Sequence, residues 1–218
     1  MYTYMRRCFN NCNPATNGEM DIVRSLQPNL TIFDVGSRSD SEFTRYSGIV
    51  HYFEPVPEFI SALEKQTTKN TRSFYNPFGL SEHAALLEYY PAHQSFHNRV
   101  VSVGKDDSAN KKILRVESAK QYISEHSLQK IDFVKIDTEG HEFSVLKGFG
   151  DALSIVDTIQ FEYGGTYKDT GIKLREVINY LREHGFSNFS YVAPGGVVPI
   201  SDFTDHYQYC NILCKRSV

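Results

Sequence analysis

The chain has 218 residues, 40% of them hydrophobic, which is enough for one full hydrophobic core. Its 23 Lys and Arg residues against 26 Asp and Glu give a net charge of −3, so it lacks the basic field that a nucleic-acid partner requires. No apolar run approaches the roughly 20 residues that cross a bilayer, and the N-terminus has no secretory apolar stretch. We therefore expect a folded cytoplasmic protein with no membrane span and no nucleic-acid partner.

The first 30 residues do not share the pattern of the rest of the chain. The stretch GEMDIVRSLQ predicts one helix that caps the edge of a sheet, preceded by a tail. From Thr31 onward, short β-rich runs alternate with amphipathic stretches, which is typical of a mostly parallel sheet with helices on both faces. The chain is thus divided into a tail with a capping helix, residues 1–30, and a single α/β domain, residues 31–218.

The alternation places the expected elements as follows. The strands are Thr31–Val35, Ile49–Glu54, Arg72–Tyr75, Ile131–Asp137, Asp157–Glu162, Phe186–Val192 and Tyr207–Lys215. The helices are Glu42–Tyr46, Pro57–Thr67, Ser118–Glu125, Phe143–Lys147 and Leu174–His184. Several of these helices begin at Ser or Pro, and Gly185 closes the last one, as helix-capping preferences predict.

Residues 86–116, called the excursion below, interrupt this alternation with three polar turns and no helical period. Loops of this length in a compact domain are usually functional or disordered. The first half is rich in Tyr, His and Phe and predicts substrate contact, with His93 and His97 as donors that orient the substrate. The second half, GKDDSANKK, predicts a mobile surface turn.

The four cysteines form two C-x3-C pairs, Cys8 with Cys12 and Cys210 with Cys214. In an extended strand the second pair would be about 13 Å apart, too far to share a zinc ion or a disulfide. We expect reduced thiols, with Cys210 and Cys214 packed as small apolar groups on the last strand.

The residues at two strand ends predict a nucleoside-binding site. In TIFDVGSRSD, Asp34 ends a strand and Gly36 allows a ligand to approach the backbone of the turn that follows. Glu54 ends the next strand, 18 residues beyond Gly36, where its carboxylate can accept both hydroxyls of a ribose.

The same turn discriminates between cofactors. It lacks the G-x-G-x-x-G spacing that a dinucleotide needs, and Asp40 would repel a phosphate. S-adenosylmethionine carries a sulfonium cation and no phosphate, so it suits an acidic surround made by Asp34, Asp40 and Asp137. A nicotinamide-dependent dehydrogenase is the less favoured alternative.

The stretch IDFVKIDTEGHEFSVLKGF brings Asp137, Glu139, His141 and Glu142 to one strand end. Open α/β sheets bind ligands just beyond such ends, so this concentration predicts a functional site. Glu142 has the alternative role of capping the next helix, and Lys135 is expected to be a salt-bridge or surface residue.

With FDVGS, YFEPVPEFISALE, NPFGLSE and IDFVKIDTEGHEFSVLKG, the sequence resembles the FkbM-type S-adenosylmethionine-dependent methyltransferases over residues 31–214. The resemblance implies the class I methyltransferase fold, a Rossmann-like seven-stranded sheet in the order 3-2-1-4-5-7-6 with only strand 7 antiparallel. It also implies methylation of hydroxyl oxygens, in many members on sugars or polyketides.

Carried over by position, the resemblance assigns three cofactor regions. Asp34, Gly36 and Ser37 would line the methionine and ribose side, Glu54 with Pro55 would hold the ribose, and Phe78, Gly79 and Leu80, in FGLS, would border the adenine. Asp137 and Glu139 would face the methyl-transfer centre. The family loop continues as D-V-G-A-N-x-G, whereas here Arg38 and Asp40 replace the Asn and the second Gly. Arg38 could instead reach the cofactor carboxylate.

Methyl transfer to an alcohol needs a base close to the hydroxyl. Asp137 or Glu139 is the first choice and His141 the next. The segment FEYGGTYKDTG, with Glu162, Tyr163 and Tyr167, would form the substrate wall opposite the excursion. A divalent metal on Asp137, Glu139, His141 and Glu162 is possible but not favoured, because Asp137 and Glu139 point to opposite sides if the strand continues.

The leading hypothesis is O-methylation of a hydroxyl on a glycan or deoxysugar, by an enzyme fused to or associated with glycosyltransferases. The alternative from another class is a carbohydrate-binding module with a methyltransferase-like fold that has lost turnover through Arg38 and Asp40.

Overall fold

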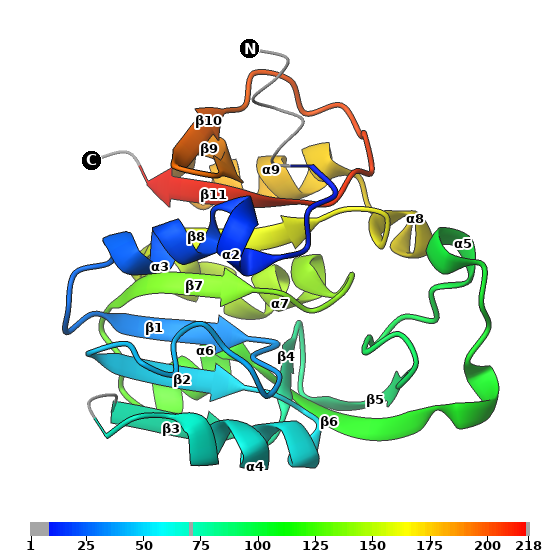
Figure 1. The fold of residues 1–218 in the computed structure, drawn as a ribbon, viewed down its shortest axis with the longest axis horizontal. Coiled ribbons are helices and arrows are strands. Elements are labelled where there is room, and N and C mark those ends of the chain that lie inside the picture. Colours follow the sequence, from blue (N-terminus) through cyan, green and yellow to red (C-terminus); the bar gives the residue numbers. More distant parts are fainter. Residues whose placement is uncertain (1–8, 70–71, 217–218) are drawn as a thin grey trace.

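A mixed sheet of eight strands forms the centre of the fold in the computed structural model, which describes residues 9–69 and 72–216. The strands are β1 (Thr31–Val35), β2 (Ile49–Phe53), β3 (Arg72–Asn76), β7 (Ile131–Ile136), β8 (Val156–Tyr163), β9 (Phe186–Ala193), β10 (Gly196–Pro199) and β11 (Cys210–Arg216). They lie in the order β10-β9-β11-β8-β7-β1-β2-β3, and β11 runs antiparallel to both its neighbours (Figure 1).

This arrangement confirms the predicted fold class and the predicted order of seven strands. The strand count was wrong by one, because β10 pairs antiparallel with β9 and extends the sheet. β10 has only four residues and lies at the sheet edge with Val197 exposed, so it carries no buried apolar run for sequence reasoning to find.

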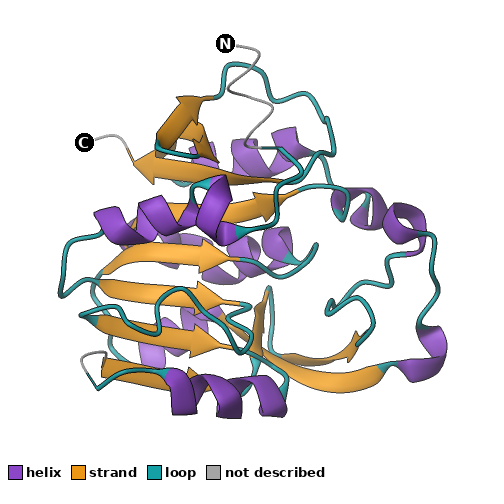
Figure 2. Ribbon diagram, in the orientation of Figure 1, coloured by secondary structure: helices purple, strands orange, loops and turns teal. Residues whose placement is uncertain are grey.

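Helices cover both faces of the sheet (Figure 2). They are α2 (Pro14–Asn17), α3 (Glu19–Ser25), α4 (Pro57–Gln66), α5 (Val100–Val103), α6 (Ala119–Glu125), α7 (Glu142–Phe149), α8 (Tyr167–Thr170) and α9 (Leu174–Glu183), with 3₁₀ turns η1 (Ser108–Asn110) and η2 (Gly150–Ile155). α3 and α4 lie on the near face in Figure 1, and α6, α7 and α9 lie behind the sheet. Two apolar clusters, one on each face, form the core.

The N-terminal helix lies across a face of the sheet, so the expectation that it caps the edge was wrong. Ile22 and Val23 of α3 pack against the cluster that contains Phe133, Val192 and Leu213, from three different strands. The division into a tail and a single domain stays a prediction, although α3 packs directly on that sheet.

The predicted helix Glu42–Tyr46 is a series of turns instead. Tyr46 N–H bonds to the carbonyl of Phe43, three residues earlier, and Ser41 Oγ accepts the N–H of Phe43. Phe43 is completely buried, so packing on the sheet determines the path of this segment.

Much of the excursion is regular structure that the sequence did not predict. β4 (Gly79–Ser81), β5 (Ala85–Tyr89) and β6 (Lys112–Ser118) form a second sheet in the order β4-β6-β5, which projects beyond the carboxyl ends of the central strands (Figure 1). In the turn between them, Asp107 is buried and accepts hydrogen bonds from Ala92 N and Asn110 Nδ2. The mobility expected of this turn stays a prediction.

The cysteines of the last strand are packed as predicted. Cys210 and Cys214 are completely buried in the core, whereas Cys12 is exposed and Cys8 lies outside the described residues. Among the helices of the described ranges, none is long and apolar enough to span a membrane.

Candidate active site

One row of residues crosses the carboxyl ends of four neighbouring strands. It consists of Glu54, Gly36 and Asp137, which directly follow β2, β1 and β7, and of Glu162, the last residue but one of β8. The residues directly before them are Phe53, Val35, Ile136 and Phe161, which are register partners on adjacent strands and are all buried. The strand register therefore brings together residues that are far apart in the sequence, as parallel pairing predicts.

Gly36 fits this row only because it has no side chain. Its φ is +80°, and a Cβ there would lie 1.9 Å from the carbonyl oxygen of Asp137. Its N–H bonds to the carbonyl of Phe53 at 2.9 Å, which fixes the turn against β2. The glycine thus allows the carboxyl ends of β1 and β7 to approach each other, and it leaves the sheet edge at this point without a side chain.

Glu54 is held in place by the turns on either side of it. Its carboxylate accepts the N–H of Arg38 at 3.0 Å and that of Val56 at 2.8 Å. Burial raises its pKa to about 7, even though both backbone bonds favour the charged form. Arg38 has φ +51°, a conformation that Asn tolerates better than Arg, so the departure from the family loop carries a local strain.

A cavity opens beside this row, and six of its lining residues were predicted from the sequence. The lining comprises Gly36, Arg38, Glu54, Pro55, Asp137 and Glu139, together with Phe59, Tyr89, Gln94, Phe96 and Thr138, which were not predicted. Tyr89 and Phe96 come from the excursion and pack edge to face, 5.6 Å between ring centroids. The abundance of aromatic residues in that segment was the available signal.

Asp34 and Ser37 are not among the residues that line the cavity. Asp34 is completely buried, accepts a hydrogen bond from Ser41 Oγ at 2.5 Å, and has its pKa raised by burial to about 7. Ser37 is also buried, and its Oγ has no hydrogen-bond partner within residues 9–69 and 72–216. Asp34 therefore supports the turn, while Ser37 keeps an unused polar atom beside it.

Lys135 is a salt-bridge residue, as predicted. Its ammonium lies 2.8 Å from Glu42, 3.3 Å from Glu19 and 3.5 Å from Asp137. Burial alone would lower its pKa, but these carboxylates outweigh it and hold the pKa well above the usual value. The lysine stays charged and links Asp137 to the N-terminal helix that carries Glu19.

Glu142 shapes the loop after β7, but it does not cap the following helix: it is the first residue of α7, whose N-cap position is His141. Glu142 Oε1 accepts the N–H groups of Thr138 and Gly140, both at 3.0 Å, at the start of α7. Glu139 between them has φ +54°. This left-handed turn places the side chain of Glu139 on the cavity side.

The excursion is fastened to this loop by contacts that the sequence did not predict. Arg99 Nη1 lies 2.7 Å from Glu139 Oε2, and Ser95 Oγ donates to the Glu139 carbonyl at 2.7 Å. Further out, Asp169 of α8 accepts the N–H groups of Val101 at 2.7 Å and Ser102 at 3.1 Å. These contacts therefore join the excursion to the loop after β7 and to α8, and the expected pair of opposite substrate walls stays a prediction.

His141 is occupied by structural hydrogen bonds. Its Nδ1 lies 3.1 Å from His97 Nε2, and its Nε2 lies 3.0 Å from Ser81 Oγ. Burial, and then His97, lower its pKa to about 3. Both ring nitrogens are engaged, which argues against the expected role as a base; His97 is likewise engaged with His141.

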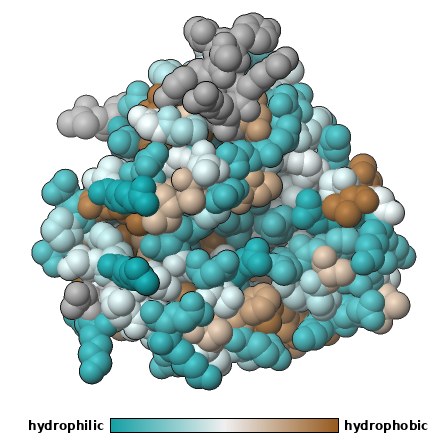
Figure 3. Space-filling model, in the orientation of Figure 1, coloured by the Kyte–Doolittle hydropathy of each residue, from teal (hydrophilic) through white to brown (hydrophobic). Residues whose placement is uncertain are grey.

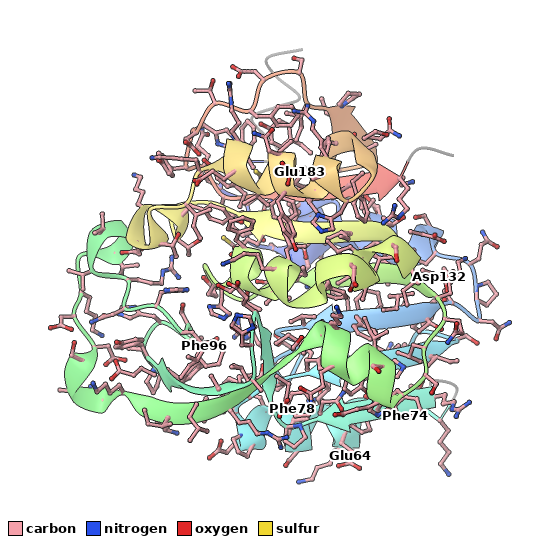
Figure 4. The ribbon with its side chains drawn as sticks, turned by 180° about the vertical axis from the view of Figure 1, so that it is seen from behind. Glu64, Phe74, Phe78, Phe96, Asp132 and Glu183 are labelled. Atoms are coloured by element: carbon pink, nitrogen blue, oxygen red, sulfur yellow. The ribbon has the colours of Figure 1, made fainter. Side chains whose placement is uncertain are left out.

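Three other predicted contact residues, which were expected to border the adenine, are not in the lining of the cavity. Leu80 is buried in the core, Gly79 lies under Phe96, and Phe78 lines a separate hollow with Arg115. Phe78 and Phe96 are apart in Figure 4, with Phe96 on the side of the excursion. Gly79 and Leu80 belong to β4 of the second sheet, and Phe78 directly precedes that strand.

The predicted substrate residues are also mainly structural. His93 Nε2 bonds to the Lys105 carbonyl at 3.1 Å, inside the excursion. Tyr163 is completely buried and donates to Asp205 at 3.1 Å, and Tyr167 is 2% exposed and packs on Tyr163 at 4.8 Å. Of the predicted wall after β8, only Glu162 reaches the site.

Asp137 and Glu139 do not point apart, so that argument against a metal was wrong. β7 ends at Ile136, and the turn that follows brings one oxygen each of Asp137, Glu139 and Glu162 within 4.8 Å of one another. Burial, followed by Asp137, raises the pKa of both Glu139 and Glu162.

The sheet order and the site at its carboxyl edge define a class I methyltransferase fold. A methyltransferase FkbM domain matches residues 34–187, which is more than half of the chain. The chain therefore belongs to the FkbM methyltransferase family, and its methyl donor is S-adenosylmethionine.

The chain is also similar to individual proteins. The hexuronic acid methyltransferase AglP of Haloferax volcanii is 26% identical over 173 residues, which are 76% of this chain and 69% of AglP. Two solved structures share the fold with a TM-score of 0.50: a precorrin-6y C5,15-methyltransferase from Geobacter metallireducens, 13% identical over 95% of this chain and 92% of its own, and an rRNA methylase from Streptococcus thermophilus, 10% identical over 94% and 98%.

Proposed function

We propose that this S-adenosylmethionine-dependent methyltransferase acts on a hydroxyl oxygen of a sugar or glycan. The observation that carries the proposal is the row at the sheet edge, in which the ribose-binding candidate Glu54 and the acid Asp137 flank the bare backbone of Gly36. The relative AglP, named for a hexuronic acid, supports a carbohydrate acceptor.

The residues of the row fit the cofactor. Glu54 would hold the ribose hydroxyls, the buried and unpartnered Ser37 Oγ offers a polar contact, and Arg38 in the cavity wall would pair with the carboxylate. S-adenosylmethionine, when bound, supplies an electrophilic methyl group on a sulfonium, which leaves as a neutral thioether. We assign the adenine contact to Tyr89 or Phe96 rather than to Phe78, because both line the cavity.

The chain would align the acceptor oxygen with the methyl group, limit the access of water and provide a base. The excursion would limit the access of water to a bound acceptor, and its contacts with Glu139 and Asp169 hold it in place as a wall. As the acceptor oxygen bonds to the methyl carbon, its proton passes to the Asp137–Glu139 pair, which remains the preferred base. Location in the cytoplasm and association with glycosyltransferases remain predictions.

The test combines cofactor binding with product analysis. Calorimetry should show one S-adenosylmethionine per chain, and sugar acceptors should gain one methyl group by mass spectrometry. Asp137→Asn and Glu139→Gln should lower the rate by about 10²–10⁴ while cofactor binding and fold persist. The matched control is Glu183→Gln, at an exposed position of α9.

Absence of cofactor binding, or methylation found on nitrogen or carbon instead of oxygen, would reject the proposal. Carbohydrate binding that persists in Asp137→Asn with no turnover in the native chain would favour the alternative of a binding module.

A further inference from the structure

Three carboxylates converge where the cavity meets the ends of β7 and β8. One oxygen each of Asp137, Glu139 and Glu162 lies within 4.8 Å of the other two. Bonds of 2.0–2.6 Å from a cation to oxygen place two ligands of the same ion at most about 4–5 Å apart. The three oxygens are thus as close as the ligands of a single ion.

Glu162 gives an independent indication of a ligand. It is 6% exposed, and its Oε2 is buried without a hydrogen-bond partner in residues 9–69 and 72–216. An ionised carboxylate in such a place is costly unless a cation or donors satisfy it.

The local cations are already committed to other acids. Lys135 is shared by Glu19, Glu42 and Asp137, and Arg99 pairs with Glu139. Within the described ranges, no Lys or Arg nitrogen lies within 4.0 Å of the Glu162 carboxylate, so the cluster has an excess of negative charge.

We propose that Asp137, Glu139 and Glu162 bind one divalent cation that prefers oxygen ligands, such as Mg²⁺, Mn²⁺ or Ca²⁺. The donors are all carboxylates, a set that suits these hard ions better than zinc or copper. Asp137 and Glu162 are fixed by neighbouring strands, which gives the ion a rigid seat. Three ligands leave coordination positions for water or for acceptor hydroxyl oxygens, and this last point alone rests on the proposed function.

The test is a titration of the protein with MnCl₂ alone, in which binding is measured as the loss of the free Mn²⁺ signal in electron paramagnetic resonance. We expect saturable binding of one Mn²⁺ per chain, displaced by Mg²⁺ or Ca²⁺. Glu162→Gln should weaken Mn²⁺ binding at least about 10-fold. Because Glu162 is buried, this variant could fail to fold, and Asp137→Asn, which should weaken binding to the same extent, then takes its place. Glu183→Gln, an identical change on α9 (Figure 4), should bind as the native chain does.

Lack of saturable Mn²⁺ binding by the native chain, or binding that both variants retain, would overturn the proposal. Displacement of Mn²⁺ by S-adenosylhomocysteine would also overturn it, because the acids would then hold the cofactor's ammonium group. Since the assay contains no acceptor and measures no methyl transfer, failure of sugar methylation leaves its result unaffected.

Discussion

Arg99 in the excursion and Glu139 in the loop after β7 form an ion pair of 2.7 Å, across 40 residues of sequence. The two side chains are 21% and 29% exposed, so solvent screens the pair only in part. The pair joins the segment that covers the cavity to the loop that carries the proposed base.

Arg99→Ala should destabilise the protein by about 1–2 kcal/mol, the usual value of a charge-assisted hydrogen bond in a partly buried setting. Chemical denaturation measures this change, and limited proteolysis should show faster cleavage within residues 90–110. The control is Arg24→Ala, whose pair with Asp21 is largely exposed and should change stability by less than about 0.5 kcal/mol. Equal losses in the two variants would contradict the role given to Arg99.

Gly36→Ala should destabilise the protein by more than about 3 kcal/mol and abolish cofactor binding, because its Cβ would lie 1.9 Å from a backbone oxygen. Gly104 provides a matched control, with φ +73° against +80° and no atom within 4 Å of an added Cβ. Gly104→Ala should therefore cost only the left-handed backbone penalty, about 1–2 kcal/mol. Thermal unfolding and calorimetry with S-adenosylhomocysteine decide between the two outcomes.

Glu54 should make the cofactor-free protein less stable as the pH rises. Its pKa is raised from 4.5 to about 7 in the folded chain, so its contribution is full below about pH 4.5 and is lost as the pH rises through 7. Glu54→Gln should therefore gain stability relative to the native chain between pH 5 and 8, by up to about 3 kcal/mol.

Parallel denaturation curves at several pH values measure that difference. Glu64→Gln, on the exposed side of α4, should show no such trend. A difference between Glu54→Gln and the native chain that stays constant with pH would show that Glu54 is already ionised in the folded protein.

His141→Ala should cost about 2–3 kcal/mol, because it leaves the buried Ser81 hydroxyl and the His97 ring without their partner. His141→Asn should recover part of this stability and leave the shape of the pH–rate profile unchanged. His83→Ala, whose side chain is 83% exposed, is the control. A folded His141→Asn protein of native stability that has lost nearly all activity would restore His141 as the base.

The central strands and the acidic residues at their carboxyl ends could be predicted because local sequence patterns specify them. Apolar runs predict the central strands, and the rule that parallel strands end at a common edge places Glu54 beside Asp137. The same rule places Glu162 there, since β8 is the neighbour of β7.

The excursion could not be predicted in this way. β5 and β6 form a partly exposed antiparallel pair, and Leu86 is 71% exposed, so no buried alternation announces them. The contacts of Arg99 and Phe96 depend on where that second sheet lies, which no short-range pattern contains. The exposed valines of α5, visible as an apolar patch at the right of Figure 3, likewise give no helical period to detect.

The row of residues at the sheet edge determines which segments of the chain can change in length during evolution. Inserting one residue in β1 or β7 would shift Gly36 or Asp137 out of register with the neighbouring strand ends, so binding of the methyl donor should not tolerate a change in the length of these strands. The excursion and the segment after β8 can lengthen or shorten without disturbing that register. New acceptor preferences should therefore arise, in nature or in the laboratory, by exchanging those two segments on an unaltered sheet.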